Sequence, residues 1–408
     1  MATFQKVKLG DITEIVSGGT PDSSNLDYWG NGNINWATLP DLHHKYLLDT
    51  HRKITELGLK NSSAKLLPVN TVIFSSRATI GEVSIAKVPT STNQGSKNFI
   101  CDPSKVNFEY LYYSLKFNAK KIEQLATGAT YKEINKTDFS NVEIALPDLP
   151  TQSRIASVLS AYDDLIENNE KRIKALEEMA SRLYTEWFVK FKSPGNEKVQ
   201  MVDSGTEFGM IPEGWEVKKI SDLVNVISGF PFKSGTYLES GKYKIVTIKN
   251  VHDAKFVMNF DSFINELPEK MPGSCVLKKG DILLSLTGNV GRVCVVYGAG
   301  HLLNQRVAKL DPNNSYIREF IYSLFRQERF QKRLEAMSNG AAQQNLSPIQ
   351  VKDIPVINPE GRTLDQFSNL TRSYFDEAIN LNEKNLNLSQ IRDHLIPQVV
   401  TGKRLLHS

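Results

Sequence analysis

The sequence predicts an α+β fold with two mixed α/β domains, related by internal duplication and separated by two long antiparallel coiled-coil helices. Two observations carry this prediction. A series of short motifs recurs in the same order about 211 residues apart, and each series is followed by a helical stretch whose apolar residues have heptad spacing. With 408 residues, the chain is long enough for two or three domains with separate cores.

The duplication rests on matched pairs of segments. In chain order they are LGDITEIVSGGTP at 9–21 with ISDLVNVISGFPF at 220–232, SSRATIGEV at 75–83 with SLTGNVGRV at 285–293, NQGSKNF at 93–99 with NQRVAKL at 304–310, EYLYYSL at 109–115 with EFIYSLF at 319–325, and LATGATYKEINKTDF at 125–139 with MSNGAAQQNLSPIQV at 337–351. Two copies are too few for a solenoid, which stacks three or more repeats. Each copy is therefore expected to be a globular domain.

Each copy combines strand and helix signals. Residues 71–75 and 281–285 are short, mainly apolar runs followed by glycine turns, which predicts strands. Asn135 is expected to cap one helix, and Ser347, followed by Pro348, is expected to cap another.

A long helix is predicted after each copy. Residues 151–191 contain no Gly or Pro, and apolar residues recur there every seven positions. Two such helices on one chain can bury their apolar rows, here called the seams, against each other. The seam positions are Ile155, Tyr162, Asn169, Leu176 and Leu183 in the first helix and Phe367, Tyr374, Leu381, Leu388 and Leu395 in the second.

Asn169 is the polar residue on the first seam. A buried amide at such a position can fix the register of a coiled coil by requiring a polar partner. A helix interruption or a half-exposed edge is an equally good interpretation.

The segment KSPGNEKVQMVDSGTEFGMIPEGW, rich in Gly, Pro and polar residues, is expected to be a linker or wrapped loop. The predicted segments are therefore a first domain at 1–150, a long helix at 151–192, the linker with the second domain at 193–361, and a long helix with the tail at 362–408.

Composition excludes several protein classes. No apolar run approaches the roughly 20 residues that a membrane-spanning helix needs, so a cytoplasmic location without membrane contact is expected. The three cysteines lack CxxC spacing, which argues against a disulfide framework or a zinc site and favours small buried side chains. The net charge of +4 suits a polyanionic partner but is too small to prove one.

Motifs of catalysis are missing from the sequence. It contains no GxxxxGK[ST] phosphate loop, no GxGxxG, GxSxG or HExxH, and INPE at 357–360 is not the [DN]PP[FY] motif of amino-methyltransferases. His43, His44 and His51 lie close in sequence, but without supporting ligands a solvated loop is favoured over a metal site. We expect a binding protein with no catalytic residue and no metal.

The loops do contain residues suited to DNA. Arg and Lys bind guanine and phosphate, whereas Asn and Gln bind adenine in the major groove. The candidates in the first copy are Arg77, Thr79, Gln94, Lys97, Thr130, Tyr131 and Lys132; those in the second are Lys233, Asn289, Arg292, Gln305, Arg306, Gln343, Gln344 and Asn345.

Any one of these side chains taken alone is better explained as a solvated loop residue. Their clustering at matched positions favours binding instead. The framework glycines agree between the copies while the polar residues differ, as expected if two related domains read different DNA sequences.

These motifs together resemble the DNA specificity subunit of type I restriction-modification systems, over the whole chain. The similar stretches are IPEGWEVKKISDLVNVISGFPFKSG at 211–235, TGATYKEI, the long stretch from LPDLPTQSRIASVLS to TEWFVKF, and LIPQVVTGKRL near the end. One departure is that the first copy begins at FQKVKLGDI, without the IPEGW lead.

The resemblance implies a non-catalytic subunit whose two target recognition domains each read one half of a bipartite site on double-stranded DNA. It also implies that the paired helices set the distance between the domains and dock two methylation subunits, which carry S-adenosylmethionine and methylate adenine. A restriction subunit that uses ATP and Mg would complete the nuclease.

Two other classes rank below this interpretation. A nuclease or fused methyltransferase with an unrecognised site would show cofactor- or metal-dependent activity in the isolated chain. A coiled-coil scaffold that does not bind DNA would be retained on a DNA column, if at all, independently of salt.

Overall fold

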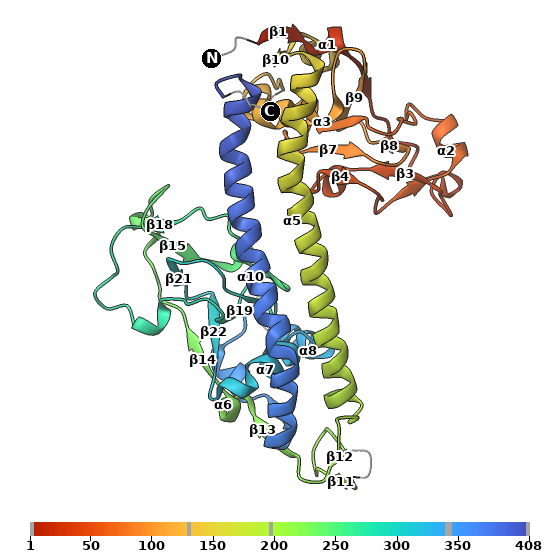
Figure 1. Ribbon diagram of the computed structural model, residues 1–408. Helices are drawn as coiled ribbons and strands as arrows, with labels where there is room; N and C mark the ends of the chain where they lie inside the picture. Colours follow the sequence, from red (N-terminus) through yellow and green to blue (C-terminus); the bar gives the residue numbers. More distant parts are fainter. Residues whose placement is uncertain (1–3, 129–131, 196–198, 339–344, 405–408) are drawn as a thin grey trace. The chain divides into compact units, whose positions relative to one another are not determined.

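The structure is a computed structural model that describes residues 4–128, 132–195, 199–338 and 345–404 (Figure 1). The chain divides into two compact units. Unit 1 comprises residues 1–167 and 387–408, and unit 2 comprises residues 168–386. Each unit contains one globular domain together with part of both long helices. Because the unit boundary cuts the helices, it does not test the four predicted segments.

The domain of unit 1 is built on a five-stranded sheet. Its strand order is β2 (Thr13–Ser17), β9 (Ser96–Cys101), β6 (Val72–Ser75), β7 (Val83–Ala86), β4 (Tyr46–Leu47). A second sheet has the order β5 (Lys53–Ile54), β3 (Ile34–Ala37), β8 (Thr90–Thr92), and β1 (Gln5–Lys8) pairs with β10 (Glu143–Leu146). Strands β6 and β7 are buried at every position, as expected when both faces of a sheet are covered.

Four short or medium helices complete this domain: α1 (Leu9–Ile12), α2 (Glu56–Lys60), α3 (Phe108–Glu123) and α4 (Lys136–Asn141). Asn107 caps α3 by accepting hydrogen bonds from two backbone N–H groups. One side of α3 buries Tyr110, Leu111 and Tyr113 in the core of the unit. Asn135 caps α4, as the sequence predicts.

The domain of unit 2 repeats this plan. Its main sheet has the order β14 (Val224–Ser228), β22 (Val307–Pro312), β19 (Ile282–Ser285), β20 (Val293–Val295), which matches β2-β9-β6-β7 strand for strand. Its second sheet, β18 (Phe263–Ile264), β15 (Tyr243–Val246), β21 (His301–Leu303), has the same parallel pair as β3 and β8. The predicted duplication of a mixed α/β domain is confirmed.

The remaining elements of unit 2 are α6 (Ile220–Leu223), α7 (Arg318–Phe325), α8 (Glu328–Ser338) and α9 (Pro348–Lys352), with the pairs β13 (Glu216–Lys219)–β23 (Pro355–Asn358) and β16 (Val251–His252)–β17 (Lys255–Phe256). Ser347 caps α9 in a capping box with Gln350, so the predicted cap is confirmed. The predicted linker contains a hairpin, β11 (Met201–Asp203) with β12 (Met210–Pro212). Ile211 in β12 and Trp215 just after it, both from IPEGW, are buried in the core.

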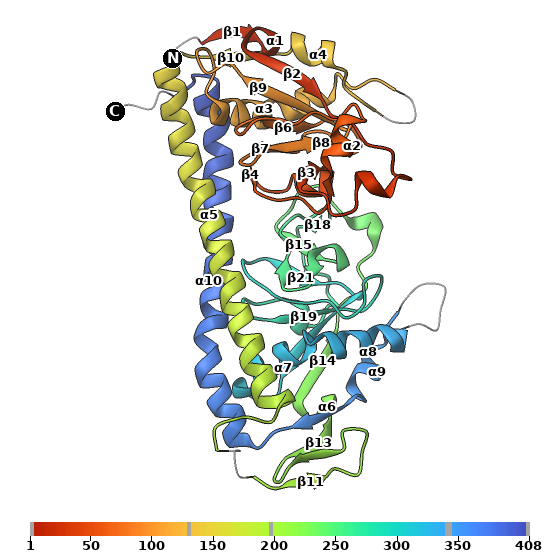
Figure 2. The ribbon, with the colours of Figure 1, turned by 90° about the vertical axis from the view of Figure 1, so that its right-hand side faces the viewer.

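Both predicted long helices are present: α5 (Leu149–Tyr184), which a short π-helical turn extends over Thr185–Val189, and α10 (Gly361–Val400) (Figures 1 and 2). In unit 1, Arg392 of α10 pairs with Asp163 of α5. In unit 2, Arg172 of α5 pairs with Glu377 of α10 at 2.9 Å. As residue numbers rise along α5, those of its partners fall along α10, so the helices are antiparallel.

The seams are turned inward. Ile155, Asn169, Phe367 and Leu381 are buried, and the other six seam residues are partly buried. Asn169 is 8% exposed, and its Nδ2 donates to Oδ1 of Asn385 at 2.8 Å. The structure thus favours the polar-partner interpretation of Asn169 over the exposed edge.

Candidate nucleic-acid interface

The repeated segments SSRATIGEV and SLTGNVGRV fold into the same loop in the two domains. Ser75 Oγ donates to the carbonyl of Thr79 at 2.7 Å and accepts from the backbone N–H of Glu82 at 2.8 Å. Ser285 Oγ does the same with the carbonyl of Asn289 at 2.5 Å and the N–H of Arg292 at 3.0 Å.

A glycine then closes each loop with a positive φ, +109° at Gly81 and +86° at Gly291. Serine and glycine therefore fix the loop, while the residues between them can differ without changing its shape.

Three loops of each domain come together at this point. In unit 1 the N–H of Ser76 donates to the carbonyl of Gly95 at 2.7 Å, and the N–H of Ile134 donates to the carbonyl of Ser76 at 3.3 Å. In unit 2 the carbonyl of Arg306 accepts from Leu286 at 3.0 Å, and the carbonyl of Leu286 accepts from Leu346 at 2.8 Å. We call each set of three loops the loop cluster of its domain.

The loop clusters collect most of the predicted DNA-contacting residues from separate parts of the sequence. In Figure 2, the chain on either side of residues 129–131 and of residues 339–344 lies on the side of its own domain that is turned away from α5 and α10. Thr130, Tyr131, Gln343 and Gln344 lie outside the described residues.

In the loop cluster of unit 1, Thr79, Gln94 and Lys132 are exposed. Gln94 is held by a hydrogen bond to Thr20. The side chain of Arg77 is 41% exposed and contacts Glu133 Oε2 at 2.5 Å.

Lys97 differs from the prediction. It is 4% exposed, and its Nζ lies 3.1 Å from Glu133 Oε1 and 3.3 Å from Ser76 Oγ. Its strand, β9, lies between β2 and β6 in the sheet, and the side chain is covered by the loops that it contacts. We therefore assign Lys97 to holding Glu133 rather than to a phosphate contact.

In the loop cluster of unit 2, Asn289, Gln305, Arg306 and Asn345 are exposed, and Arg292 is partly buried. Lys233 is exposed beside the cluster, on a groove of about 530 Å³ that Phe230 and Phe232 also line. The N–H of Gln305 donates to the carbonyl of Phe230 at 3.1 Å, so this groove adjoins the loop cluster.

Glu133 is the member of the unit 1 cluster that the sequence reasoning missed. It accepts from Arg77, 56 residues away, and from Lys97, 36 residues away. Partial burial acts to raise the pKa of its carboxyl group, but the hydrogen bonds and charges of Arg77 and Lys97 together outweigh it, so the pKa is lowered. The matching segments place Asn345 at the equivalent position, and both residues form a backbone bridge to the first loop, Glu133 with Arg77 and Asn345 with Thr287.

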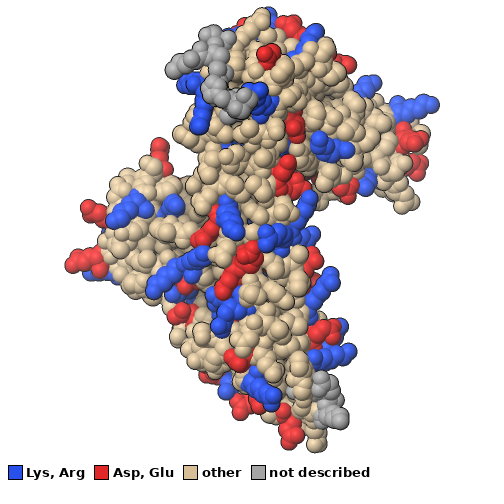
Figure 3. All heavy atoms as spheres, in the orientation of Figure 1, with Lys and Arg blue, Asp and Glu red and all other residues tan. Residues whose placement is uncertain are grey.

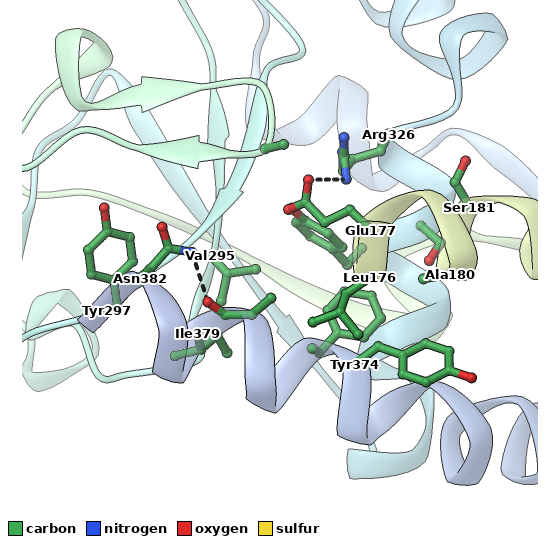
Figure 4. Close-up of a pocket in the computed structure, with 15 residues that line it drawn as sticks. Leu176, Glu177, Ala180, Ser181, Val295, Tyr297, Arg326, Tyr374, Ile379 and Asn382 are labelled. Atoms are coloured by element: carbon green, nitrogen blue, oxygen red, sulfur yellow. Dashed lines mark hydrogen bonds and ion pairs between the residues drawn. The ribbon is translucent and has the colours of Figure 1, made fainter. Parts of the chain in front are cut away.

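A cavity of about 70 Å³ lies in unit 2 between the domain and the two helices (Figure 4). It is lined by Glu177 and Ala180 of α5, Phe375 of α10, and Ser323 and Arg326 of the domain, among others. Glu177 lies 3.5 Å from Arg326. Burial raises the pKa of the Glu177 carboxyl group, and the neighbouring guanidinium only partly offsets this.

The equivalent positions of unit 1 carry side chains that bond to one another. By the repeat, Tyr113 stands where unit 2 has Ser323, Asp163 where it has Phe375, and Arg392 where it has Ala180. Tyr113 Oη donates to Asp163 Oδ2 at 2.5 Å, and Arg392 binds the other oxygen of that carboxylate. At these three positions unit 1 therefore has a hydrogen-bonded polar group, whereas unit 2 has side chains that line a cavity.

Other features concern chemistry outside the loop clusters. Among the described residues, no group of three or more His, Cys, Asp or Glu could hold a metal ion. His43 and His44 are exposed, and His51 pairs with Asp41 at 2.8 Å. The cysteines are free, with Cys275 and Cys294 buried. In the part of the chain that the structure describes, no helix has the length and apolarity needed to span a membrane.

The face drawn in Figure 3 carries charges of both signs. On the face drawn in Figure 3, Lys and Arg are interspersed with Asp and Glu. On this face, charge does not point to a DNA surface.

Comparisons with known proteins agree with one another. The family model of the type I restriction modification DNA specificity domain matches residues 1–178 and 212–387. The specificity subunit of the type I restriction enzyme MjaIX of Methanocaldococcus jannaschii is 33% identical, over 97% of this chain and 92% of the relative. The HindI specificity subunit of Haemophilus influenzae is 22% identical over 99% of this chain and 100% of its own length.

A similar fold has been solved by crystallography. The S subunit of a type I restriction-modification system from M. genitalium superimposes with a TM-score of 0.59 and 18% identity, covering 97% of this chain and 96% of that one.

Proposed function

Because this chain belongs to the family of type I restriction-modification DNA specificity subunits, we propose that it reads a bipartite DNA site, with one half-site for each recognition domain. A specificity subunit is the non-catalytic recognition component of its complex, so the enzyme and scaffold interpretations are not favoured.

The observation that carries this proposal is the pair of loop clusters. Each cluster has the same backbone closure, but the side chains that reach the surface differ: the partly exposed Arg77 with Thr79 and Lys132 in one, and Asn289, Gln305 and Asn345 in the other. Side chains of these types discriminate base edges in the major groove, and neighbouring cations hold phosphates. Two loop clusters with the same backbone and different side chains suit two different half-sites.

We also propose two copies of a methylation subunit as partners, on the evidence of repeated apolar exposure along the helices. Ile391 on α10 in unit 1 is 51% exposed, and Met179, its equivalent on α5 in unit 2, is 49% exposed. Val158, partly buried, lines an open groove with Ile391 in unit 1, and its equivalent in unit 2, Leu370, is 49% exposed. Equivalent apolar patches suit two copies of one protein.

These partners would supply the chemistry. Each methylation subunit would bring S-adenosylmethionine and methylate an adenine, which must be flipped out of the duplex to be reached. A restriction subunit would bring ATP and Mg. The specificity subunit itself would hold no cofactor and would act in the cytoplasm.

The test of the proposed function is methylome sequencing of DNA from cells that carry the chain together with its methylation subunits. We expect methylated adenines within one bipartite motif, and none when the chain is omitted. Methylation without a common motif, or a motif with a single continuous half, would contradict the proposal.

Partner number is tested separately. Met179→Glu and Ile391→Glu should each remove one methylation subunit from the purified complex, as measured by its mass. Lys174→Ala, an exposed change on α5, serves as the control. Loss of both copies from either single variant would contradict independent docking.

A further inference from the structure

Three charged side chains connect the interior of the first domain to its loop surface. Lys97 is buried in the sheet, Glu133 accepts from it at 3.1 Å, and Arg77 contacts the other oxygen of Glu133 at 2.5 Å. The backbones of Arg77 and Glu133 are bridged to each other as well. The outermost member, Arg77, is therefore held at both its main chain and its side chain.

We propose that this Lys97–Glu133–Arg77 relay presents Arg77 as a pre-oriented reader of guanine in the half-site of the first domain. The inference rests on the proposed function. A guanidinium has five N–H donors in a fixed plane, and Glu133 engages one of its terminal nitrogens. The remaining donors can address O6 and N7 of guanine, the commonest specific contact in the major groove. Ordering the side chain before binding reduces the entropy lost on binding.

Lys97 compensates the negative charge of the Glu133 carboxylate on this loop. A carboxylate on a DNA-facing loop repels phosphates, but Lys97 supplies a compensating charge from below, and the relay as a whole has one net positive charge. In this account Lys97 and Glu133 are positioning residues, and Arg77 alone touches the base.

The second domain lacks the relay. Its equivalents of Arg77, Lys97 and Glu133 are Thr287, Ala308 and Asn345. The frame is the same, yet none of the three is charged. Guanine reading from this position therefore belongs to the first domain only, and Asn345 suits adenine instead.

The experiment compares variants in the full complex by methylome sequencing and by binding to oligonucleotides. Arg77→Ala and Arg77→Lys should both relax one G·C pair of one half-site, with a loss of discrimination between about fivefold and 150-fold. Lysine keeps the charge but loses the planar two-donor contact, so its failure separates reading from charge. Glu133→Gln should relax the same base pair, and Glu133→Asp should retain part of the preference.

The control variant and the results that would contradict the inference can be told apart. Lys132→Ala should weaken binding to all sequences alike, and unchanged reading of the other half-site shows that each variant is folded. Unchanged preference in Arg77→Ala, or equal loss at every base pair, would overturn the inference while leaving the proposed function intact. Absence of a bipartite motif in the parent complex would instead overturn the proposed function.

Discussion

The contribution of single exposed cations in the loop clusters to DNA binding should be measurable from the salt dependence of the affinity. We expect Lys132→Ala and Arg306→Ala each to reduce the slope of log affinity against log salt by about 0.9, because each variant leaves one phosphate unneutralised and its counterion in place. The measurement is binding of the full complex to its site at several salt concentrations. Lys174→Ala on α5 should leave the slope unchanged; an unchanged slope in both loop variants would place these residues off the DNA.

The amides before α9 should act on one half-site only. Changing Gln343, Gln344 and Asn345 together to Ala should cost about 1–3 kcal/mol of discrimination for each adenine that is no longer read. The repeat places Tyr131, Lys132 and Glu133 at the equivalent positions of the first domain, so its half-site should be unaffected. Methylome sequencing of the triple variant is the measurement, and equal loss at both half-sites would argue against independent readers.

His301 should make unit 2 sensitive to acid. It is fully buried, its Nε2 lies 3.1 Å from the carbonyl of Tyr297, and its ring stacks on Phe260. Burial, assisted by the charge of Lys244, lowers its pKa from 6.5 to about 4. The unfolded chain therefore binds a proton that the folded chain excludes between these values, and stability falls as pH falls through that window.

The expected loss from pH 7 to pH 4 is up to about 3 kcal/mol from this residue. Urea unfolding at several pH values measures it. His301→Phe should flatten the profile over that window, whereas His252→Gln, a change at an exposed position, should not. Identical profiles for His301→Phe and the parent would remove His301 as the cause.

At the scale of elements, the Asn169–Asn385 pair should specify how α5 and α10 align. Asn169→Leu removes a hydrogen-bonding partner from Asn385, at a cost of about 1–3 kcal/mol. The double change to Leu should cost less than the sum of the single changes, because the two residues contact each other. Unfolding of the four proteins of this cycle gives the coupling energy, and strict additivity would mean that the pair does not act as a unit.

Elements whose signals are local could be predicted from the sequence. Asn135 and Ser347 cap helices as expected because a cap depends on residues within one turn. The seams follow from heptad spacing alone. The β11–β12 hairpin was not foreseen, because its segment is rich in polar residues and Gly and its pairing runs across a loop between residues 203 and 210.

In the candidate site, too, features with a local sequence signal could be predicted and those that depend on the folded domain could not. The Ser75 and Ser285 loops could be matched by their repeated letters, and their exposed residues could be named. Burial of Lys97 could not, since it depends on β9 lying between β2 and β6 in the sheet. Glu133 was missed because one acidic residue among 45 Asp and Glu has no distinguishing neighbour in sequence; its partners meet it only in the folded domain.

At the scale of the whole molecule, α5 and α10 should set the preferred distance between half-sites. One heptad inserted in register into both helices lengthens them by about 10 Å, or about three base pairs of B-DNA at 3.4 Å each. Because Asn169 faces Asn385, the matched insertion points are after Asn169 and after Lys384. Three base pairs also rotate the far half-site by roughly 100°, so activity should fall even at the longer spacing.

A plasmid library with spacers of varied length, read out by methylation, measures this. We expect a longer preferred spacer with reduced activity or no activity, and unchanged bases within each half-site. Insertion into α5 alone is the control, since it breaks the seam alignment. Full activity of the double insertion on the parental spacer would show that the helices are not the ruler.

The contacts between each domain and the long helices differ between the units, and this difference limits how a recognition domain can be grafted from one position to the other. A graft of the first domain into the second position would bring the phenol of Tyr113 to the cavity of unit 2. There Phe375 stands in place of Asp163, which accepts the hydrogen bond of Tyr113, and Ala180 stands in place of Arg392, which balances the charge of Asp163. Its hydroxyl would then lose its acceptor. A chimera that exchanges only the loop clusters leaves the contacts between domain and helices intact in both units. A graft of the whole first domain into the second position should also carry Phe375→Asp and Ala180→Arg. The loop clusters can therefore be exchanged between the two domains, whereas the contacts between a domain and the long helices are specific to its position.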